Sequence, residues 1–239
     1  MDSTKLIIAL DYDSAEACLT LVRQLDPKSC RLKIGKELFT AAGPSIVEAV
    51  QHQGFEVFLD LKFHDIPNTV AKAVKAAANM GVWMVNVHAS GGQAMMEAAL
   101  EQAQAAVKPP YLIAVTVLTS IDQPILNSVG ISGSPAQQVE RLALLAKMSG
   151  LNGVVCSAHE VHQIKAACGP EFLCVTPGIR PQGSNQDDQK RIMTPQQAIQ
   201  NGSDYLVVGR PVTQAKDPAA VCIDINNAID QAQATRGKQ

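Results

Sequence analysis

Three ionisable residues lie close together in one short apolar stretch: Asp60, Lys62 and Asp65. In a β-strand, residues two apart point to the same side, so Phe58 and Asp60 should face the protein interior with Lys62 at the end of the strand. Such charges are costly to bury unless they are paired. One acid and one base suffice for a structural ion pair, whereas two acids around a lysine, with Lys33 nearby, predict an alternating charge array. This array would hold a protonated lysine as a proton donor.

Two glycine–arginine pairs occur later in the chain, in Pro177-Gly178-Ile179-Arg180 and in Gly209-Arg210. Glycine lets backbone N–H groups approach an anion, and arginine can bind it through two parallel hydrogen bonds. Each pair alone is equally typical of an ordinary turn. Their joint position after two successive predicted strands favours a phosphate site.

The segment Pro181 to Met193 is polar and contains Gln189. Loops of this length in a compact barrel are often lids, so we expect Gln189 to fold over a bound ligand. A merely mobile loop is the alternative.

Eight short apolar runs alternate with helical patterns, as expected of parallel strands covered on both faces. The runs are Leu6–Asp11, Leu32–Gly35, Val57–Lys62, Met84–His88, Leu112–Leu118, Val154–Ser157, Leu173–Pro177 and Tyr205–Gly209.

Proline, capping pairs and glycine mark the intervening helices. Predicted first helical positions are Pro44, Pro135, Pro195 and Pro218; predicted capping pairs are Asp13 with Glu16, Ser157 with Glu160 and Thr194 with Gln197; predicted stops are Gly54, Gly81, Gly150, Gly169 and Gly202.

Eight strand–helix units in 239 residues predict an α/β fold, a closed (β/α)8 TIM barrel forming a single domain over residues 1–239. The rival is a doubly wound open sheet, which usually has a glycine-rich turn after its first strand. The segment Asp11–Ala15 contains no glycine. In a barrel, functional residues gather at the carboxyl ends of the strands, where Asp11, His88, Thr119 and Ser120 also fall.

Composition argues against several classes of protein. The formal net charge is -2 and no basic run exceeds two residues, so we expect no nucleic-acid partner. No apolar stretch is long enough for a membrane span, and the first one, Leu6–Leu10, is too short for a signal peptide. The six cysteines form no C-x-x-C pair, which indicates free thiols and a cytoplasmic location.

The stretch from Asp60 to Thr69 resembles the D-x-K-x-x-D-I-P-N-T signature of the orotidine 5'-phosphate decarboxylase family. Shorter motifs of that family follow in the same order along nearly the whole chain. They are L-D at 10–11, K-I-G at 33–35, L-T-S at 118–120, T-P-G-I-R-P at 176–181 and V-G-R-P at 208–211.

This resemblance implies a homodimeric barrel that converts orotidine 5'-phosphate to UMP and carbon dioxide, the last step of de novo pyrimidine synthesis. It implies neither a metal nor an organic cofactor. By the same resemblance, Lys62 is the proton donor to C6 of the pyrimidine and Asp60 lies beside the departing carboxylate. Lys33 and Asp65 complete the charge array, with Asp65 supplied by the neighbouring subunit.

The resemblance also implies a set of substrate contacts. Those to the ribose are Asp11, Lys33 and Thr69; those near the pyrimidine are Thr119 and Ser120; those to the phosphate are Arg180, Gly209 and Arg210; Gln189 closes from the lid, and Asp60, Ile66, Pro67, Asn68 and Pro177 complete the set.

Three alternatives stay open. A metal-dependent sugar-phosphate lyase of the same superfamily shares D-x-K-x-x-D, but it carries glutamate where this chain has Lys33, and a lysine there repels a divalent cation. An imine-forming aldolase would need Lys62 as a neutral amine, which acidic neighbours disfavour. A non-enzymatic phospholigand-binding barrel would need Arg180 and Arg210 but not the charge array.

Overall fold

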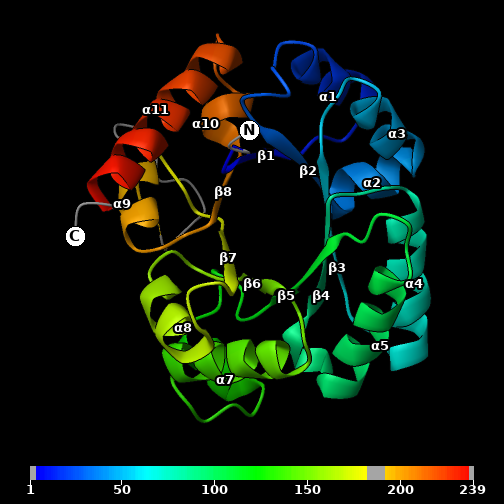
Figure 1. Ribbon diagram of the computed structural model, residues 1–239, viewed down its shortest axis with the longest axis vertical. Helices are drawn as coiled ribbons and strands as arrows, with labels where there is room; N and C mark the ends of the chain where they lie inside the picture. Colours follow the sequence, from blue (N-terminus) through cyan, green and yellow to red (C-terminus); the bar gives the residue numbers. More distant parts are fainter. Residues whose placement is uncertain (1–3, 182–191, 237–239) are drawn as a thin grey trace.

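A ring of parallel strands forms the centre of the computed structural model, which describes residues 4–181 and 192–236 (Figure 1). The strands close in sequence order, with β1 hydrogen-bonded to both β2 and β8. The predicted (β/α)8 barrel is therefore confirmed. The strands are β1 (Leu6–Leu10), β2 (Arg31–Gly35), β3 (Val57–Phe63), β4 (Met84–His88), β5 (Tyr111–Val115), β6 (Gly153–Val155), β7 (Leu173–Thr176) and β8 (Tyr205–Val208).

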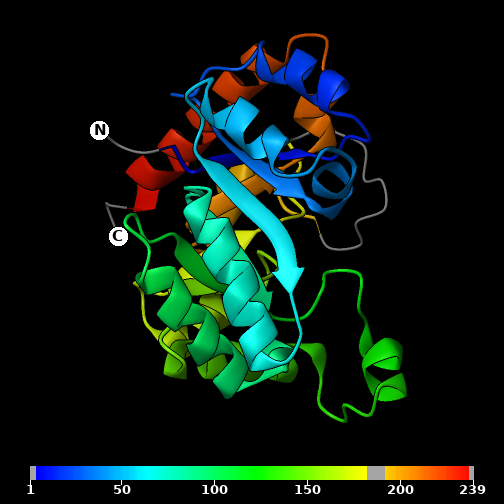
Figure 2. The same cartoon turned by 90° about the vertical axis from the view of Figure 1, so that its right-hand side faces the viewer.

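Helices surround the ring (Figures 1 and 2). They are α1 (Ala15–Val22), α2 (Lys36–Ala42), α3 (Ser45–Gln51), α4 (Pro67–Asn79), α5 (Gln93–Gln104), α6 (Gln123–Ser128), α7 (Pro135–Met148), α8 (Val161–Cys168), α9 (Pro195–Gln200), α10 (Arg210–Thr213) and α11 (Pro218–Arg236), with a 3-10 turn, η1, at Ala89–Gly91. The short helix α6 stands away from the barrel on a long connection (Figure 2). Within the described ranges, no helix is both long and apolar enough to cross a bilayer.

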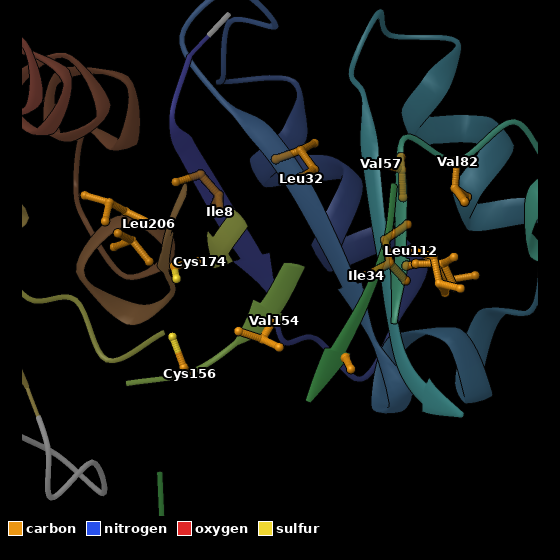
Figure 3. Close-up of a cluster of buried hydrophobic side chains, with 14 of the residues drawn as sticks. Ile8, Leu32, Ile34, Val57, Val82, Leu112, Val154, Cys156, Cys174 and Leu206 are labelled. Atoms are coloured by element: carbon orange, nitrogen blue, oxygen red, sulfur yellow. The ribbon is translucent and has the colours of Figure 1, made fainter. Parts of the chain in front are cut away.

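Two apolar layers follow from the alternation of side chains along each strand. On β1, Leu6, Ile8 and Leu10 belong to the large outer core between strands and helices, whereas Ile7 and Ala9 point inside the barrel. Figure 3 shows part of the outer core, with labelled residues from every strand except β4. The inner core consists of Ile7, Ala9, Phe58, Met84, Ile113, Val175 and Val207.

Most predicted helix signals are confirmed. Pro135, Pro195 and Pro218 begin their helices, and Thr194 with Gln197 forms a capping box. All five predicted helix stops are glycines with positive φ, a conformation that glycine adopts without a Cβ clash.

Three local expectations were wrong in detail. The cap of α1 is Ser14, whose side chain accepts from Ala17 N–H, and not Asp13. Pro44 lies just before α3 and not inside it. Glu160 accepts from Ser157 N–H but precedes α8 directly, so this pair does not cap the helix as a full box. Each error is a shift of one to three residues at a helix end, where several polar residues compete for the same N–H groups.

The inner core forms the floor of the site. In a strand, residues two apart share a face. Two residues beyond Ala9, Phe58, Val175 and Val207 lie Asp11, Asp60, Pro177 and Gly209, all of which line one cavity. Because the strands are parallel, their carboxyl ends meet at one rim. The apolar floor therefore supports a polar layer directly above it.

Candidate active site

A cavity of about 260 Å³ opens at this rim and gathers most of the predicted site residues. Its lining comprises Ala9, Asp11, Lys33, Phe58, Asp60, Lys62, Val115, Val117, Leu118, Thr119, Val155, Cys156, Pro177, Arg180, Val207, Gly209 and Arg210. Asp11, just after β1, and the ionic groups of β2 and β3 thus share one space with two arginines that follow β7 and β8. The apolar members other than Pro177 were not predicted as site residues; they extend the inner core upward into the cavity wall.

Part of the predicted charge array, without Asp65, forms a chain of ion pairs. Lys62 Nζ lies 2.6 Å from Asp60 Oδ1, and Lys33 Nζ lies 3.2 Å from Asp60 Oδ2. Lys33 Nζ is also 3.5 Å from Asp11 Oδ1. Asp60 and Lys33 are each 8% exposed, so water screens their interaction poorly. One carboxylate therefore lies between two ammonium groups.

Burial and charge act in opposite directions on this array. Burial alone would lower the pKa of Lys33, but the carboxylates of Asp60 and Asp11 outweigh it, and the pKa lies above its ordinary value. Burial alone would raise the pKa of Asp60, yet Lys33, Lys62 and a hydrogen bond from Asn86 lower it. Both groups are consequently charged near neutral pH.

Lys62 occupies an irregular part of β3. Leu59 pairs with Val85 and Phe63 with Val87, so residues 60–62 lie opposite the single residue Asn86 of β4. Among the described residues other than glycine, Lys62 alone has positive φ, at 52°. That conformation costs a side-chain-bearing residue about 1 kcal/mol or more. Lys62 and Asp60 share a side as predicted, but through this bulge rather than through regular strand alternation.

Asn86 is a site residue that the sequence analysis missed. It is fully buried, and its side chain bonds to both members of the Lys62–Asp60 pair. A signal was available, because Met84, Asn86 and His88 alternate along one strand and Met84 belongs to the inner core. A polar residue at an inward position needs a polar partner there.

Part of the predicted set does not line the cavity of this chain. Ser120 is exposed, and so is the run from Asp65 to Thr69, which leads into α4 with Pro67 at its first position. Asp65 Oδ1 accepts the N–H of Ile66 at 2.6 Å. Gln189 lies outside the described residues. The cavity of one chain therefore contains the array without Asp65.

The arginine side of the cavity is built by the turns after β7 and β8. Gly178 has φ 82°, which a residue with a side chain rarely adopts, and Arg180 is buried. Arg180 N–H donates to Met193 O at 3.0 Å, and Met193 N–H donates to Gly178 O at 3.2 Å. This small bridge anchors both ends of the predicted lid segment, of which residues 182–191 lie outside the described part of the chain.

His88 is half-buried at the end of β4, with its ring 5.5 Å from that of His64. Burial, followed by the positive charges of His64, Lys36 and Lys62, lowers the pKa of His88 to about 4. Since the unfolded chain protonates first, His88 destabilises the fold as pH falls from about 6.5 through about 4.

We expect the ¹H–¹³C NMR signal of His88 Cε1 to titrate with a midpoint near 4, because burial disfavours the charged ring and neighbouring positive charges add to that effect. Assignment by a His88→Gln variant identifies the signal, and this variant should also lose less stability than the wild type between pH 7 and pH 5. A midpoint above 6 would contradict the electrostatic picture of this part of the site.

Known proteins of one family are similar to this chain. A model of the orotidine 5'-phosphate decarboxylase / HUMPS family matches residues 4–225. Proteins named orotidine 5'-phosphate decarboxylase are similar over nearly the whole chain. That of Teredinibacter turnerae is 64% identical over 94% of this chain and 97% of its own length. That of Saccharophagus degradans is 63% identical over 98% and 97%.

Solved structures are similar as well. The crystal structure of orotidine 5'-phosphate decarboxylase from Lactobacillus acidophilus has a TM-score of 0.85 at 40% identity, covering 94% of this chain and 98% of the other. An uncharacterized conserved protein from Geobacillus kaustophilus has a TM-score of 0.82 at 41% identity, with coverages of 94% and 99%. The chain belongs to the orotidine 5'-phosphate decarboxylase / HUMPS family.

Proposed function

We propose that this chain decarboxylates orotidine 5'-phosphate to UMP and carbon dioxide in pyrimidine biosynthesis, without a cofactor. The observation that carries the proposal is the paired array of Lys62, Asp60 and Lys33 in a cavity that also contains Arg180 and Arg210. The names of the relatives at more than 60% identity support the same substrate.

The chemistry requires stabilisation of a carbanion. Loss of carbon dioxide leaves negative charge at C6 of the pyrimidine, where no electron sink is available. A fixed ammonium close to that carbon stabilises the charge as it develops, and it does so without reorganisation. In this proposal Lys62 supplies that ammonium and then donates its proton to C6, giving UMP. Asp60 and Lys33 keep Lys62 in place, and Asp60 faces the departing carboxylate.

The arginines contribute at a distance from the reacting carbon. Arg180 and Arg210 present guanidinium groups suited to the 5'-phosphate, with Gly209 leaving its backbone accessible. Energy gained by binding the phosphate can be used to orient the pyrimidine against Lys62. Asp11, which contacts Lys33, and Thr119 complete the proposed contacts to ribose and base, with Pro177 in the wall.

The metal-dependent sugar-phosphate lyase is disfavoured by what occupies the cavity. Lys33 places an ammonium between Asp11 and Asp60, and the raised pKa of Lys33 keeps it charged. A divalent cation requires oxygen ligands at this position and is repelled by a fixed positive charge. A non-enzymatic phosphate-binding barrel leaves the buried array unexplained, because binding phosphate needs the arginines alone.

Exposure of the signature segment supports a shared site in a homodimer. Asp65 to Thr69 are all exposed and lie outside the cavity of their own chain, and Ile66 is 66% exposed. A large apolar side chain surrounded by polar ones is typical of an interface core with a polar rim. In our proposal this segment packs on a second copy, so that Asp65 and Thr69 enter the partner's cavity with Ile66, Pro67 and Asn68 beside them.

The remaining proposals concern the chain as a whole. Eight strands close one barrel, and one continuous outer core lies between it and the helices, which supports a single domain over residues 1–239. The six cysteines are free and buried, which fits a reducing compartment, and we propose the cytoplasm.

Incubation with orotidine 5'-phosphate in the presence of EDTA tests the function directly. We expect loss of substrate absorbance and formation of UMP at an undiminished rate, because Lys33 takes the place of a metal. A parallel reaction with added Mg²⁺ is the control. Activity that EDTA removes and Mg²⁺ restores would favour the metal-dependent lyase, and binding without turnover would favour the phosphate-binding barrel.

A further inference from the structure

Asn86 joins the two reactive members of the array from a neighbouring strand. Its Oδ1 accepts the backbone N–H of Lys62 at 2.8 Å, and its Nδ2 donates to Asp60 Oδ1 at 2.7 Å. Asp60 Oδ1 also accepts a hydrogen bond from Lys62 Nζ at 2.6 Å. The Asn86 side chain is fully buried and does not line the cavity, so it acts from beneath the site.

The bulge in β3 explains why an amide is needed there. Residues 60–62 lie opposite Asn86 alone, so Lys62 N–H bonds to the Asn86 side chain and not to a main-chain carbonyl of β4. A buried N–H without an acceptor is unfavourable, and the positive φ of Lys62 is unfavourable as well. A regular register continued from the Leu59–Val85 pair would place Lys62 opposite His88 and so displace its ammonium along the strand.

We propose that Asn86 is a positioning residue that holds the bulge, and thereby fixes the Lys62 ammonium and the Asp60 carboxylate in their reactive arrangement. The inference rests on the proposed function, because its consequence is measured as decarboxylation. An amide suits the position because it accepts from one partner and donates to the other. Leucine provides neither bond, and an ionised aspartate accepts but cannot donate.

Asn86→Leu should lower kcat by on the order of 100-fold, as expected when a reactive group is displaced by about 1 Å. Its KM and its affinity for UMP should change little, because Arg180 and Arg210 are untouched. Asn152→Leu is the matched control. Asn152 Oδ1 likewise accepts a strand N–H, that of Leu112 at 2.8 Å, but at the start of β5 and away from the cavity. This control should lower thermal stability and leave kcat unchanged.

Asn86→Asp gives a second readout in a side chain of the same shape. The groups that face it are Asp60 and Lys62 on β3, Lys33 beyond Asp60, and His88 on its own strand. Burial and the adjacent Asp60 favour its protonated form, which can donate to Asp60 while its carbonyl accepts from Lys62 N–H. The ratio of its kcat to that of the wild type should therefore rise as pH is lowered from 8 to 5.5.

The outcomes separate this inference from the proposed function. A positioning role is supported by three results beside normal wild-type turnover. They are a lowered kcat in Asn86→Leu, near-normal UMP affinity in the same variant, and a pH-dependent recovery of kcat in Asn86→Asp. A kcat within twofold of wild type in a folded Asn86→Leu protein, or an equal loss in Asn152→Leu, would overturn it. Absence of turnover in the wild type refutes the proposed function, and the inference with it.

Discussion

Replacing Lys62 with alanine should reduce kcat by at least about 10⁴-fold, since it removes both the proton donor and the charge that stabilises the carbanion. The structure gives a reason for the size of this effect. Lys62 Nζ lies 2.6 Å from Asp60 Oδ1. The Asp60 carboxylate is itself buried and bonded to Lys33 and Asn86. Water admitted into the vacated space cannot provide an equally fixed positive charge.

Binding should survive this change, because the arginines and Gly209 remain. UMP affinity, measured by calorimetry, is expected to stay detectable in Lys62→Ala. Lys108→Ala serves as the matched control, because Lys108 is exposed before β5, at the end of the barrel opposite the cavity. Turnover within tenfold of wild type in Lys62→Ala would remove Lys62 from the role of donor.

The barrel could be predicted from the sequence because the alternation of apolar runs with helical patterns agrees with the residues that start and stop the helices. Apolar runs such as Leu6–Leu10 alternate with helices begun by Pro135 or Pro195 and ended by positive-φ glycines. The ends of strands were predicted less well. The fifth run was expected to reach Leu118, but β5 ends at Val115, because apolar residues beyond the strand line the cavity and look the same in sequence.

The site was predictable where function requires charge and unpredictable where it requires geometry. Asp60, Lys62 and Lys33 are unusual in apolar strands, so their types alone indicated a shared array. Asn86 carries no charge, and its importance depends on a bulge that places it opposite three residues of β3. Bulges depend on pairing between strands, which a single sequence does not display.

Asp65 poses the remaining question, since the array lacks it within one chain. Its side chain is exposed and accepts the N–H of the next residue, Ile66, which is itself an exposed apolar residue. If a second copy covers this segment, Asp65→Ala should lower kcat by about 10²-fold or more, because it removes one charge from a preorganised site. The loss should appear although Asp65 lies outside the cavity of its own chain.

Mixing two inactive variants tests this arrangement without ambiguity. In a symmetric dimer of Lys62→Ala and Asp65→Ala chains, one site combines the intact Lys62 of one chain with the intact Asp65 of the other. Random exchange of equal amounts should therefore restore about one quarter of the wild-type activity, because half of the dimers are hybrids and each has one intact site. Exchange is confirmed by native mass spectrometry with one variant isotopically labelled. No recovery among confirmed hybrids would argue against a site built from two chains, and the exposed signature segment would then need another explanation.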